Sequence, residues 1–376
     1  MKKRLRILFL ADFFSFLGGT EYINYNLLAG LTHRGHEVKV CVGEKPVFDT
    51  WTAMIERLGV SLYASDTPYQ DTQDITAERK FVEDTVAGLV EEWKPDVIFS
   101  HPPGKLLIAF LERFPGTQIP IVAMEYTVPG ETSKYWYHPR LPEIQDRITA
   151  YIAKCEEAAL GLRDYYGYQG PIYRAPNLVA GGPKEEAEPE LCGALDSVGC
   201  VARLSPEKGI GFLLGAWRKT AAAFPKASLH LYGHGLHEQY YRSLADYLGL
   251  GASVVFEGTF PPVTGIAEVS KRHRVFVQPS LFESIPNSMI ELMLRKKAFV
   301  ASRVGGIPEL LHPENREGIL VSPGSTDEIA EALLRLLKNP ALADDMAENA
   351  YRAACAKYDY EVTLDAYEKV FMEVAT

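Results

Sequence analysis

Two pairs of charged residues stand out in the second half of the chain. Glu283 and Glu291 are eight positions apart, and Arg203 and Lys208 are five positions apart about 80 residues earlier. A guanidinium and an ammonium group suit the oxygens of a diphosphate. A carboxylate only accepts hydrogen bonds, so it suits the vicinal hydroxyls of a ribose or a hexose. Together these four residues predict a site for a nucleotide sugar.

Predicted strands end just before these residues. Glu283 follows an apolar strand at residues 275–278, and Arg203 follows another at residues 198–201. Strand and helix patterns alternate along the whole chain, which favours parallel sheets with helices on both faces. In such sheets ligands bind beyond the carboxyl ends of the strands, at a topological switch point. The charged residues are therefore expected to gather at one sheet edge.

The same patterns predict the other elements. Strands are expected at residues 6–11, 37–42, 95–100, 119–124, 228–232, 254–257, 298–302 and 318–321. Helices are expected at residues 21–34, 80–93, 156–166, 209–224, 238–248, 264–271, 288–296, 307–311 and 326–337. A stretch without periodicity, residues 179–193, is rich in Gly, Pro and Glu and is predicted to be a linker.

The chain resembles the retaining GT-B glycosyltransferases of family GT4 from end to end. Glu283 and Glu291 match the family's Glu-x7-Glu signature, and Arg203 with Lys208 matches its Arg…Lys signature. Other matching segments are the first strand with its glycine loop, the fourth strand with its histidine, the Pro-Asn segment and the C-terminal helix, at residues 7–21, 95–101, 175–179 and 358–367.

This resemblance implies an α/β GT-B fold, in which two Rossmann-like, doubly wound parallel-sheet domains face a cleft. Residues 1–178 would form the acceptor-side domain, and residues 358–376 would cross back to it. Residues 194–357 would form the domain that binds the nucleotide sugar.

The resemblance also implies roles for individual residues. Arg203 and Lys208 would stabilise the leaving diphosphate, Glu283 would face the donor sugar, and Glu291 would accept hydrogen bonds from the ribose. His101 is expected to act in catalysis by contacting a sugar. Further donor contacts would come from the glycine turn and the start of the helix after Glu283: Gly18, Gly19, Ser284, Ile285, Pro286 and Asn287.

Several of these residues also have a purely structural interpretation. Gly18 and Gly19 do not form a G-x-G-x-x-G fingerprint and could simply permit a tight turn. His101 could cap a strand end. Many family members carry a histidine where Tyr126 stands, so this chain departs from the family there. Glu125 and Tyr126 are expected to line the acceptor side in its place.

Composition narrows the range of partners. The net charge is −10, divided as −4 over residues 1–178 and −6 over the remainder. Neither half is basic, which argues against nucleic acid and against attachment to an anionic membrane. No apolar run approaches the roughly 20 residues of a membrane span. A cytoplasmic protein is expected, and its five scattered cysteines are expected to be reduced.

The predicted activity is transfer of a hexosyl group from a nucleotide-diphosphate sugar, with a UDP-sugar favoured, to an acceptor hydroxyl. No cofactor is expected. His230, His234 and His237 do not share a helix face or a ligand spacing, so no metal site is predicted. Two alternatives stay open: a hydrolysing nucleotide-sugar epimerase of the same architecture, and a non-catalytic homologue that binds nucleotide sugars.

Overall fold

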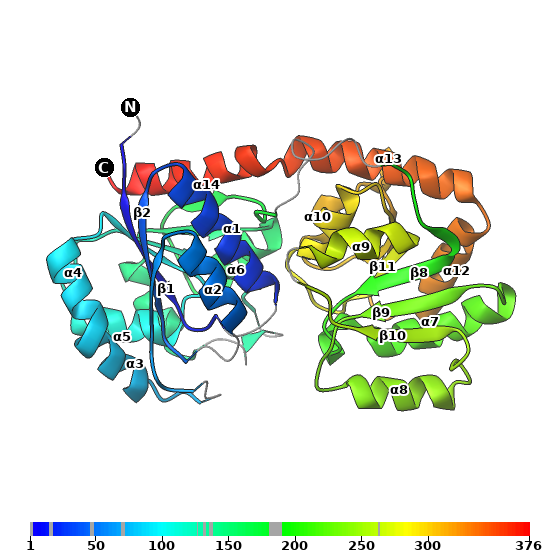
Figure 1. Cartoon of the computed structure of the whole chain (residues 1–376), viewed down its shortest axis with the longest axis horizontal. Helices are drawn as coiled ribbons and strands as arrows, with labels where there is room; N and C mark the ends of the chain where they lie inside the picture. The colour runs from blue at the N-terminus through cyan, green and yellow to red at the C-terminus, as the bar shows by residue number, and fades with distance from the viewer. Residues whose placement is uncertain are drawn as a thin grey trace. The chain divides into compact units, whose positions relative to one another are not determined.

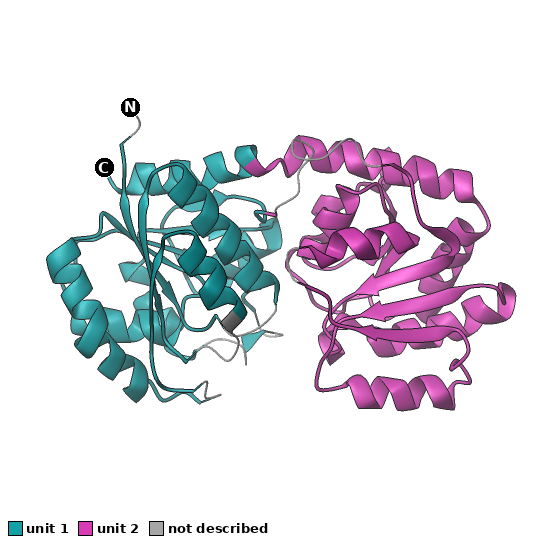
Figure 2. Ribbon diagram, in the orientation of Figure 1, with its two compact units in different colours: residues 1–178, 361–376 teal, residues 179–360 magenta. Residues whose placement is uncertain are grey.

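The computed structural model describes residues 3–14, 18–45, 49–68, 72–125, 127–130, 133–134, 138–179, 190–261 and 264–376. The chain divides into two compact units (Figure 2). Unit 1 comprises residues 1–178 together with 361–376, and unit 2 comprises residues 179–360. Each unit is built around one sheet, with helices on both sides of it (Figure 1).

Unit 1 contains a seven-stranded parallel sheet with the order β3-β2-β1-β4-β5-β6-β7. Its strands are β1 (Arg6–Ala11), β2 (Glu37–Val42), β3 (Ser61–Ala64), β4 (Val97–Ser100), β5 (Ile121–Met124), β6 (Ala150–Ala153) and β7 (Ile172–Arg174). Its helices are α1 (Gly19–His33), α2 (Asp49–Arg57), α3 (Thr76–Phe81), the π-helical turn η1 (Val82–Val86), α4 (Ala87–Trp93), α5 (Lys105–Arg113), the 3₁₀ segment η3 (Leu141–Arg147), α6 (Glu156–Asp164) and α14 (Tyr360–Val374).

Unit 2 contains a six-stranded parallel sheet with the order β10-β9-β8-β11-β12-β13. Its strands are β8 (Ala194–Val201), β9 (Ser228–Tyr232), β10 (Val254–Gly258), β11 (His273–Gln278), β12 (Ala298–Ser302) and β13 (Ile319–Val321). Its helices are the 3₁₀ turn η4 (Pro206–Lys208), α7 (Ile210–Ala223), α8 (Glu238–Tyr247), α9 (Gly265–Arg272), α10 (Asn287–Met293), α11 (Ile307–Leu310), the 3₁₀ turn η5 (Pro313–Asn315), α12 (Thr326–Leu337) and α13 (Pro340–Lys357).

The central strands are apolar because helices cover both of their faces. Every residue of β4, β5, β6 and β12 is buried. Such strands read as continuous hydrophobic runs rather than alternating ones. In unit 1 the rings of Phe9 on β1 and Phe99 on β4 meet edge to face, with centroids 5.0 Å apart. Continuous runs therefore mark the central strands in the sequence.

Each sheet has a point where the strand order reverses. In unit 1, β1 lies between β2 and β4, and in unit 2, β8 lies between β9 and β11. The crossovers of a doubly wound sheet leave opposite faces at this point, so a crevice opens beyond the strand ends. Asp12 and His101 follow β1 and β4, whereas Arg203 and Glu283 follow β8 and β11.

The C-terminal helix α14 packs onto unit 1. Phe371 is fully buried and lies edge to face against Phe99, with ring centroids 5.3 Å apart. The hydroxyl of Tyr367 donates to the carbonyl oxygen of Pro176 at 3.1 Å. Arg34, which directly follows α1, forms ion pairs with three acidic side chains of α14. The last residues of the chain thus complete the core of the first unit.

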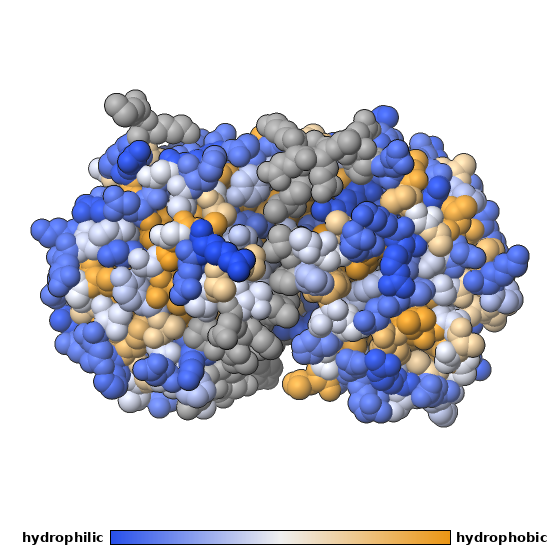
Figure 3. Space-filling view, in the orientation of Figure 1, coloured by the Kyte–Doolittle hydropathy of each residue, from blue (hydrophilic) through white to orange (hydrophobic). Residues whose placement is uncertain are grey.

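The visible face of the molecule mixes hydrophilic and hydrophobic residues (Figure 3). Among the helices that the structure describes, none is long and apolar enough to cross a membrane.

Candidate functional site

The loop after β11 holds Glu283 in a short chain of hydrogen bonds. The amide Nε2 of Gln278 donates to Ser280 Oγ at 2.8 Å, and Ser280 Oγ donates to Glu283 Oε2 at 3.2 Å. Lys208 Nζ donates to the same carboxylate oxygen at 2.6 Å. The Lys208 and Glu283 side chains are only 17% and 11% exposed. A cation and a carboxylate from two separate motifs therefore form one partly buried pair.

A glycine lets the two loops approach closely. Gly209 follows the turn η4 with φ of +66°, in the left-handed region that favours glycine. A Cβ atom at this position would lie 2.0 Å from the carbonyl oxygen of Pro279. The backbone N–H of Leu281 also donates to the carbonyl oxygen of Glu207 at 2.8 Å. The β8 loop is thereby held against the end of β11, which brings Lys208 to Glu283.

A second glycine packs against the Glu283 loop. Gly305 has φ of +53°, and a Cβ atom there would lie 1.7 Å from the carbonyl oxygen of Glu283. The N–H of Gly306 donates to the carbonyl oxygen of Ser284 at 2.7 Å. The Gly305-Gly306 turn thus packs directly against the backbone of the predicted sugar-binding residue.

Arg203 lies in the same loop as Lys208 but does not join the pair. Its side chain is 66% exposed, and its Nη2 lies 3.4 Å from Glu207 Oε1. The hydroxyl of Ser205 also donates to Glu207 Oε1 at 2.5 Å. The guanidinium is thus paired within its own loop rather than with Glu283.

The other predicted donor residues surround the start of α10. Ser284 and Ile285 are buried, and Pro286 directly precedes the helix, which begins at Asn287. Glu291 lies on the same helix and is 6% exposed. These residues lie at the start of a helix and on it, as the sequence predicted. Their roles in binding a donor stay predictions.

In unit 1, Gly18 and Gly19 lie at the start of α1. Gly18 has an extended backbone, with φ of −114° and ψ of 174°, and the helix begins at Gly19. Gly18 at the N-cap has no side chain that could cap this end. The amides of the first turn of a helix have no partner within the helix and can bind an anion. The geometry is compatible with the predicted contact to a diphosphate, and that contact stays a prediction.

His101 and Glu125 end neighbouring strands and are both buried. His101 has no exposed surface, and Glu125 is 3% exposed. Burial raises the pKa of the Glu125 carboxyl to about 8, against the opposing influence of the Tyr166 hydroxyl and the Lys154 ammonium. Burial lowers the pKa of His101 well below its usual range. Tyr126, the other predicted acceptor residue, lies outside the described residues.

Two polar residues near these strand ends were not identified from the sequence. Asp12 accepts backbone hydrogen bonds from Lys105 at 2.8 Å and from Leu106 at 2.9 Å, and so caps α5. Burial raises the pKa of Asp12 to about 6. Asn24 of α1 bonds to His101. In the sequence, the position of Asp12 directly after a buried strand was the one feature that could have identified it as a site residue. No feature of the sequence pointed to Asn24.

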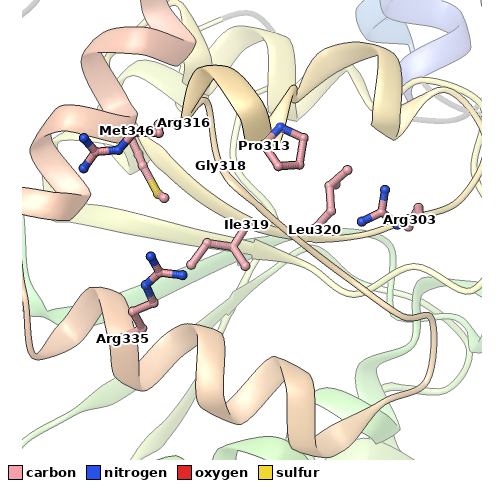
Figure 4. A pocket seen from close by; sticks show the side chains of 8 residues that line it. All are labelled: Arg303, Pro313, Arg316, Gly318, Ile319, Leu320, Arg335 and Met346. Carbon is pink, nitrogen blue, oxygen red and sulfur yellow. The ribbon is translucent and has the colours of Figure 1, made fainter.

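Two cavities of unit 2 contain none of the predicted site residues. One, of about 290 Å³, lies along β13 (Figure 4). Arg316 and Arg335 lie toward one end of this strand and Arg303 toward the other, so the three side chains do not converge (Figure 4). β13 ends the sheet, and charged residues along such an edge discourage pairing with other chains. The other cavity, of about 500 Å³, lies beside α9, between Tyr232, Phe260 and Arg272.

Three comparisons connect this geometry to known proteins. A family model described as Glycosyltransferase Family 4 matches residues 17–180, and one described as Glycosyl transferases group 1 matches residues 196–339. An alpha-D-kanosaminyltransferase of Streptomyces kanamyceticus is 28% identical over 174 residues, which are 46% of this chain and 45% of that protein. The match thus spans less than half the length of that relative.

Solved structures resemble the chain along nearly its whole length. Sucrose-phosphate synthase from Thermosynechococcus elongatus has a TM-score of 0.81 at 18% identity, covering 98% of this chain and 99% of that one. Anabaena HepE in complex with UDP-glucose has a TM-score of 0.78 at 18% identity, covering 98% and 100%. At this identity the likeness shows the fold alone. With the two parallel sheets, it confirms the predicted GT-B fold.

Proposed function

The chain belongs to the GT-B glycosyltransferases, and we propose that it transfers a hexosyl group from a nucleotide-diphosphate sugar to an acceptor hydroxyl. The observation that carries this proposal is the contact of 2.6 Å between Lys208 and Glu283 at the switch point of the unit 2 sheet. In a nucleotide sugar the diphosphate and the hexose are directly bonded. Lys208 suits the diphosphate and Glu283 suits the hydroxyls of the hexose, so a site for a nucleotide sugar is expected to hold these two side chains next to each other.

The proposed reaction retains the configuration of the anomeric carbon. The bond from that carbon to the diphosphate oxygen breaks, and the bond to the acceptor oxygen forms on the same face. The departing phosphate oxygen takes the acceptor proton. Negative charge grows on the diphosphate, so Lys208 and Arg203 stabilise the transition state more than the ground state. No metal and no cofactor take part in the proposed reaction.

The Lys208–Glu283 and Arg203–Glu207 ion pairs affect how a donor can bind. An ammonium has three donors and a guanidinium has five, so Lys208 and Arg203 can each donate to a phosphate oxygen while they keep their contacts to Glu283 and Glu207. The Glu283 carboxylate can accept several hydrogen bonds, so a hydroxyl of the sugar can bind to it beside Lys208. A complete nucleotide sugar therefore offers partners to both members of the Lys208–Glu283 pair, whereas the nucleotide alone offers no hexose hydroxyl to Glu283.

A UDP-sugar is the proposed donor, with a GDP-sugar second. The support is the resemblance to the family and the likeness to Anabaena HepE, whose structure contains UDP-glucose. Titration calorimetry with UDP, GDP and their sugars tests this choice. A ligand that binds only the folded protein at 100 times its Kd stabilises it by about 2.7 kcal/mol, so thermal unfolding provides a second measurement. Tight binding of GDP with none of UDP would overturn the UDP assignment.

A hydrolysing epimerase is the second candidate, because unit 1 carries protonatable carboxyl groups at its strand ends. Burial raises the pKa of Asp12 to about 6 and that of Glu125 to about 8, and groups that titrate near neutral pH suit proton transfer. Incubation with UDP-glucose and no acceptor separates the two functions. Release of an epimerised sugar would favour the epimerase, whereas slow release of unchanged glucose is expected of a transferase.

A further inference from the structure

The side chain of Asn24 makes two bonds to one residue. Its Nδ2 lies 3.2 Å from the backbone carbonyl oxygen of His101, and its Oδ1 lies 2.5 Å from Nδ1 of the His101 ring. Asn24 is on α1, whereas His101 directly follows β4, 77 positions along the chain. Both residues are fully buried. This double contact fixes the ring relative to the helix that begins at the glycine pair.

The two bonds together determine which ring nitrogen carries the proton. A backbone carbonyl only accepts, so the nitrogen of the Asn24 amide must face it, and the amide oxygen must face the ring. That oxygen also only accepts, so the ring Nδ1 must be the donor. Burial and the nearby Lys154 ammonium lower the pKa of His101, which keeps the ring neutral. Nε2 therefore carries a lone pair and no proton.

Within the described part of the chain, the lone pair on Nε2 has no hydrogen-bond donor. Among the described residues no side chain or backbone group hydrogen-bonds to this atom, although it is buried. Buried polar atoms are nearly always satisfied, and each exception calls for an explanation. Nε2 of His101 lies just after β4, next to the switch point of the sheet, and its lone pair can accept a hydrogen bond from a neutral O–H group. The hydroxyl groups of a sugar have this chemistry.

We propose that Asn24 is a positioning residue, which holds His101 in the Nδ1–H tautomer so that Nε2 accepts a hydrogen bond from a hydroxyl of the transferred sugar. This inference rests on the proposed function and adds to it a residue for donor recognition. The ring is enclosed in the free protein, so the sugar reaches Nε2 only when the residues around it rearrange.

Nitrogen NMR of the ¹⁵N-histidine-labelled full chain tests the tautomer without any substrate. In the free wild-type protein, Nδ1 of His101 is expected at the shift of a protonated nitrogen and Nε2 at that of a bare one. Asn24→Leu should mix the two tautomers. Asn26→Leu is the matched control, because Asn26 is also buried on α1 but donates to the Leu178 carbonyl at 3.0 Å. A wild-type ring protonated on Nε2 would overturn the proposal.

Ligand addition tests the role of Nε2. UDP-glucose should move the Nε2 resonance, and UDP, which lacks the hexose, should not. If calorimetry shows UDP-glucose bound while Nε2 does not move, the proposal is wrong although the proposed function stands. If calorimetry shows no binding of any nucleotide sugar, the proposed function fails, and the role of Nε2 fails with it, whatever the tautomer.

The pH dependence of transfer provides a readout that a purely structural role would not move. Asn24→Asp places a negative charge beside Nδ1 and should raise the pH at which the ring takes a second proton. Nε2 then becomes a donor, so kcat/KM should fall on the acid side at a higher pH than in the wild type. Asn24→Leu should lower kcat/KM by about tenfold or more relative to Asn26→Leu, the cost of one buried hydrogen bond. Equal losses and unchanged profiles would overturn the proposal.

Discussion

At the scale of single residues, the pair Lys208–Glu283 brings the two charged motifs of unit 2 together. The two atoms are 2.6 Å apart, and both side chains are largely shielded from water. The pairing holds the Lys208 side chain in place, at the position where the diphosphate is proposed to leave. A cation that acts on developing charge is expected to matter for turnover more than for binding.

Lys208→Ala and Arg203→Ala are each expected to lower kcat by about 10²-fold or more, because each removes a charge that stabilises the leaving diphosphate. Steady-state kinetics with one donor and acceptor measures the loss. Lys219→Ala is the control, since Lys219 is also paired with a carboxylate but lies on α7, away from these loops. Near-normal turnover in Lys208→Ala would show that the ion pair is only structural.

The raised pKa of the Glu125 carboxyl predicts how the free energy of unfolding depends on pH. Its pKa is about 8 in the folded protein and 4.5 in its usual state, so between these values the folded chain holds a proton that the unfolded chain has lost. Stability must then fall as the pH rises from about 4.5 to 8, by a few kcal/mol in order of magnitude. Glu125→Gln removes this dependence, because an amide does not titrate.

The free energy of unfolding of Glu125→Gln should therefore exceed that of the wild type at pH 8, with a difference that shrinks toward pH 5. Urea unfolding at several pH values measures it. Glu92→Gln, at an exposed position of unit 1, should show no such trend. A constant offset between Glu125→Gln and wild type would contradict the assigned cause, since it would not depend on ionisation.

At the scale of elements, glycines determine how the loops beyond the strand ends fit together. Gly209 and Gly305 both have positive φ, and both sit where a Cβ atom would strike a backbone carbonyl. Neither clash can be relieved by moving a flexible side chain. The position of Glu283 thus depends on two residues that carry no functional group.

Gly305→Ala should destabilise the protein and displace Glu283, because its Cβ would lie 1.7 Å from that residue's carbonyl oxygen. Gly249→Ala is the matched control: its φ is +73°, yet nothing lies within 4 Å of the added carbon. The left-handed conformation alone costs about 1–2 kcal/mol, and Gly305→Ala should cost clearly more. Urea unfolding compares the two. Similar losses would show that the backbone around Glu283 yields easily.

At the scale of the whole molecule, the chain leaves unit 1 and its last helix belongs to unit 1 again. α14 is tied there by polar contacts as well as by packing. His36 bridges the backbone N–H of Leu5 at 3.2 Å and the Glu368 carboxylate at 3.1 Å. The folding of unit 1 therefore requires residues at both ends of the chain.

Phe371→Ala should lower the stability of unit 1 by about 3–5 kcal/mol, because it leaves a cavity beside Phe99. Hydrogen exchange measures this element by element: amides of β1 and β4 should lose protection, whereas those of β8 and β11 should keep it. Val362→Ala, at a position 57% exposed on the same helix, should change protection little. Equal loss in both sheets would contradict the assignment of α14 to unit 1.

Much of the architecture could be predicted because local patterns encode it. Continuous apolar runs predicted β1 and β12, and alternating apolar residues predicted β2 and β9, all at their observed bounds. The strands β3, β6 and β7 were not predicted. β3 and β7 are short edge strands with partly exposed residues and no clear alternation, whereas β6 is a buried run of only four residues. The 18-residue helix α13 was also missed, since its alanine-rich sequence shows only a weak apolar face.

The sequence by itself determined which residues stand at strand ends, since this follows from motif and pattern along the chain. Only the tertiary structure decided which of them meet. Lys208 reaches Glu283 across 75 positions, Asn24 reaches His101 across 77, and Asp12 caps α5 from 93 positions away. These contacts exist because β8 pairs with β11 and β1 with β4, and that order depends on how the crossovers pack. The hydrophobic pattern of a strand depends on which of its faces are buried, and it does not show which strand lies next to it in the sheet. These contacts could therefore not be predicted from the sequence.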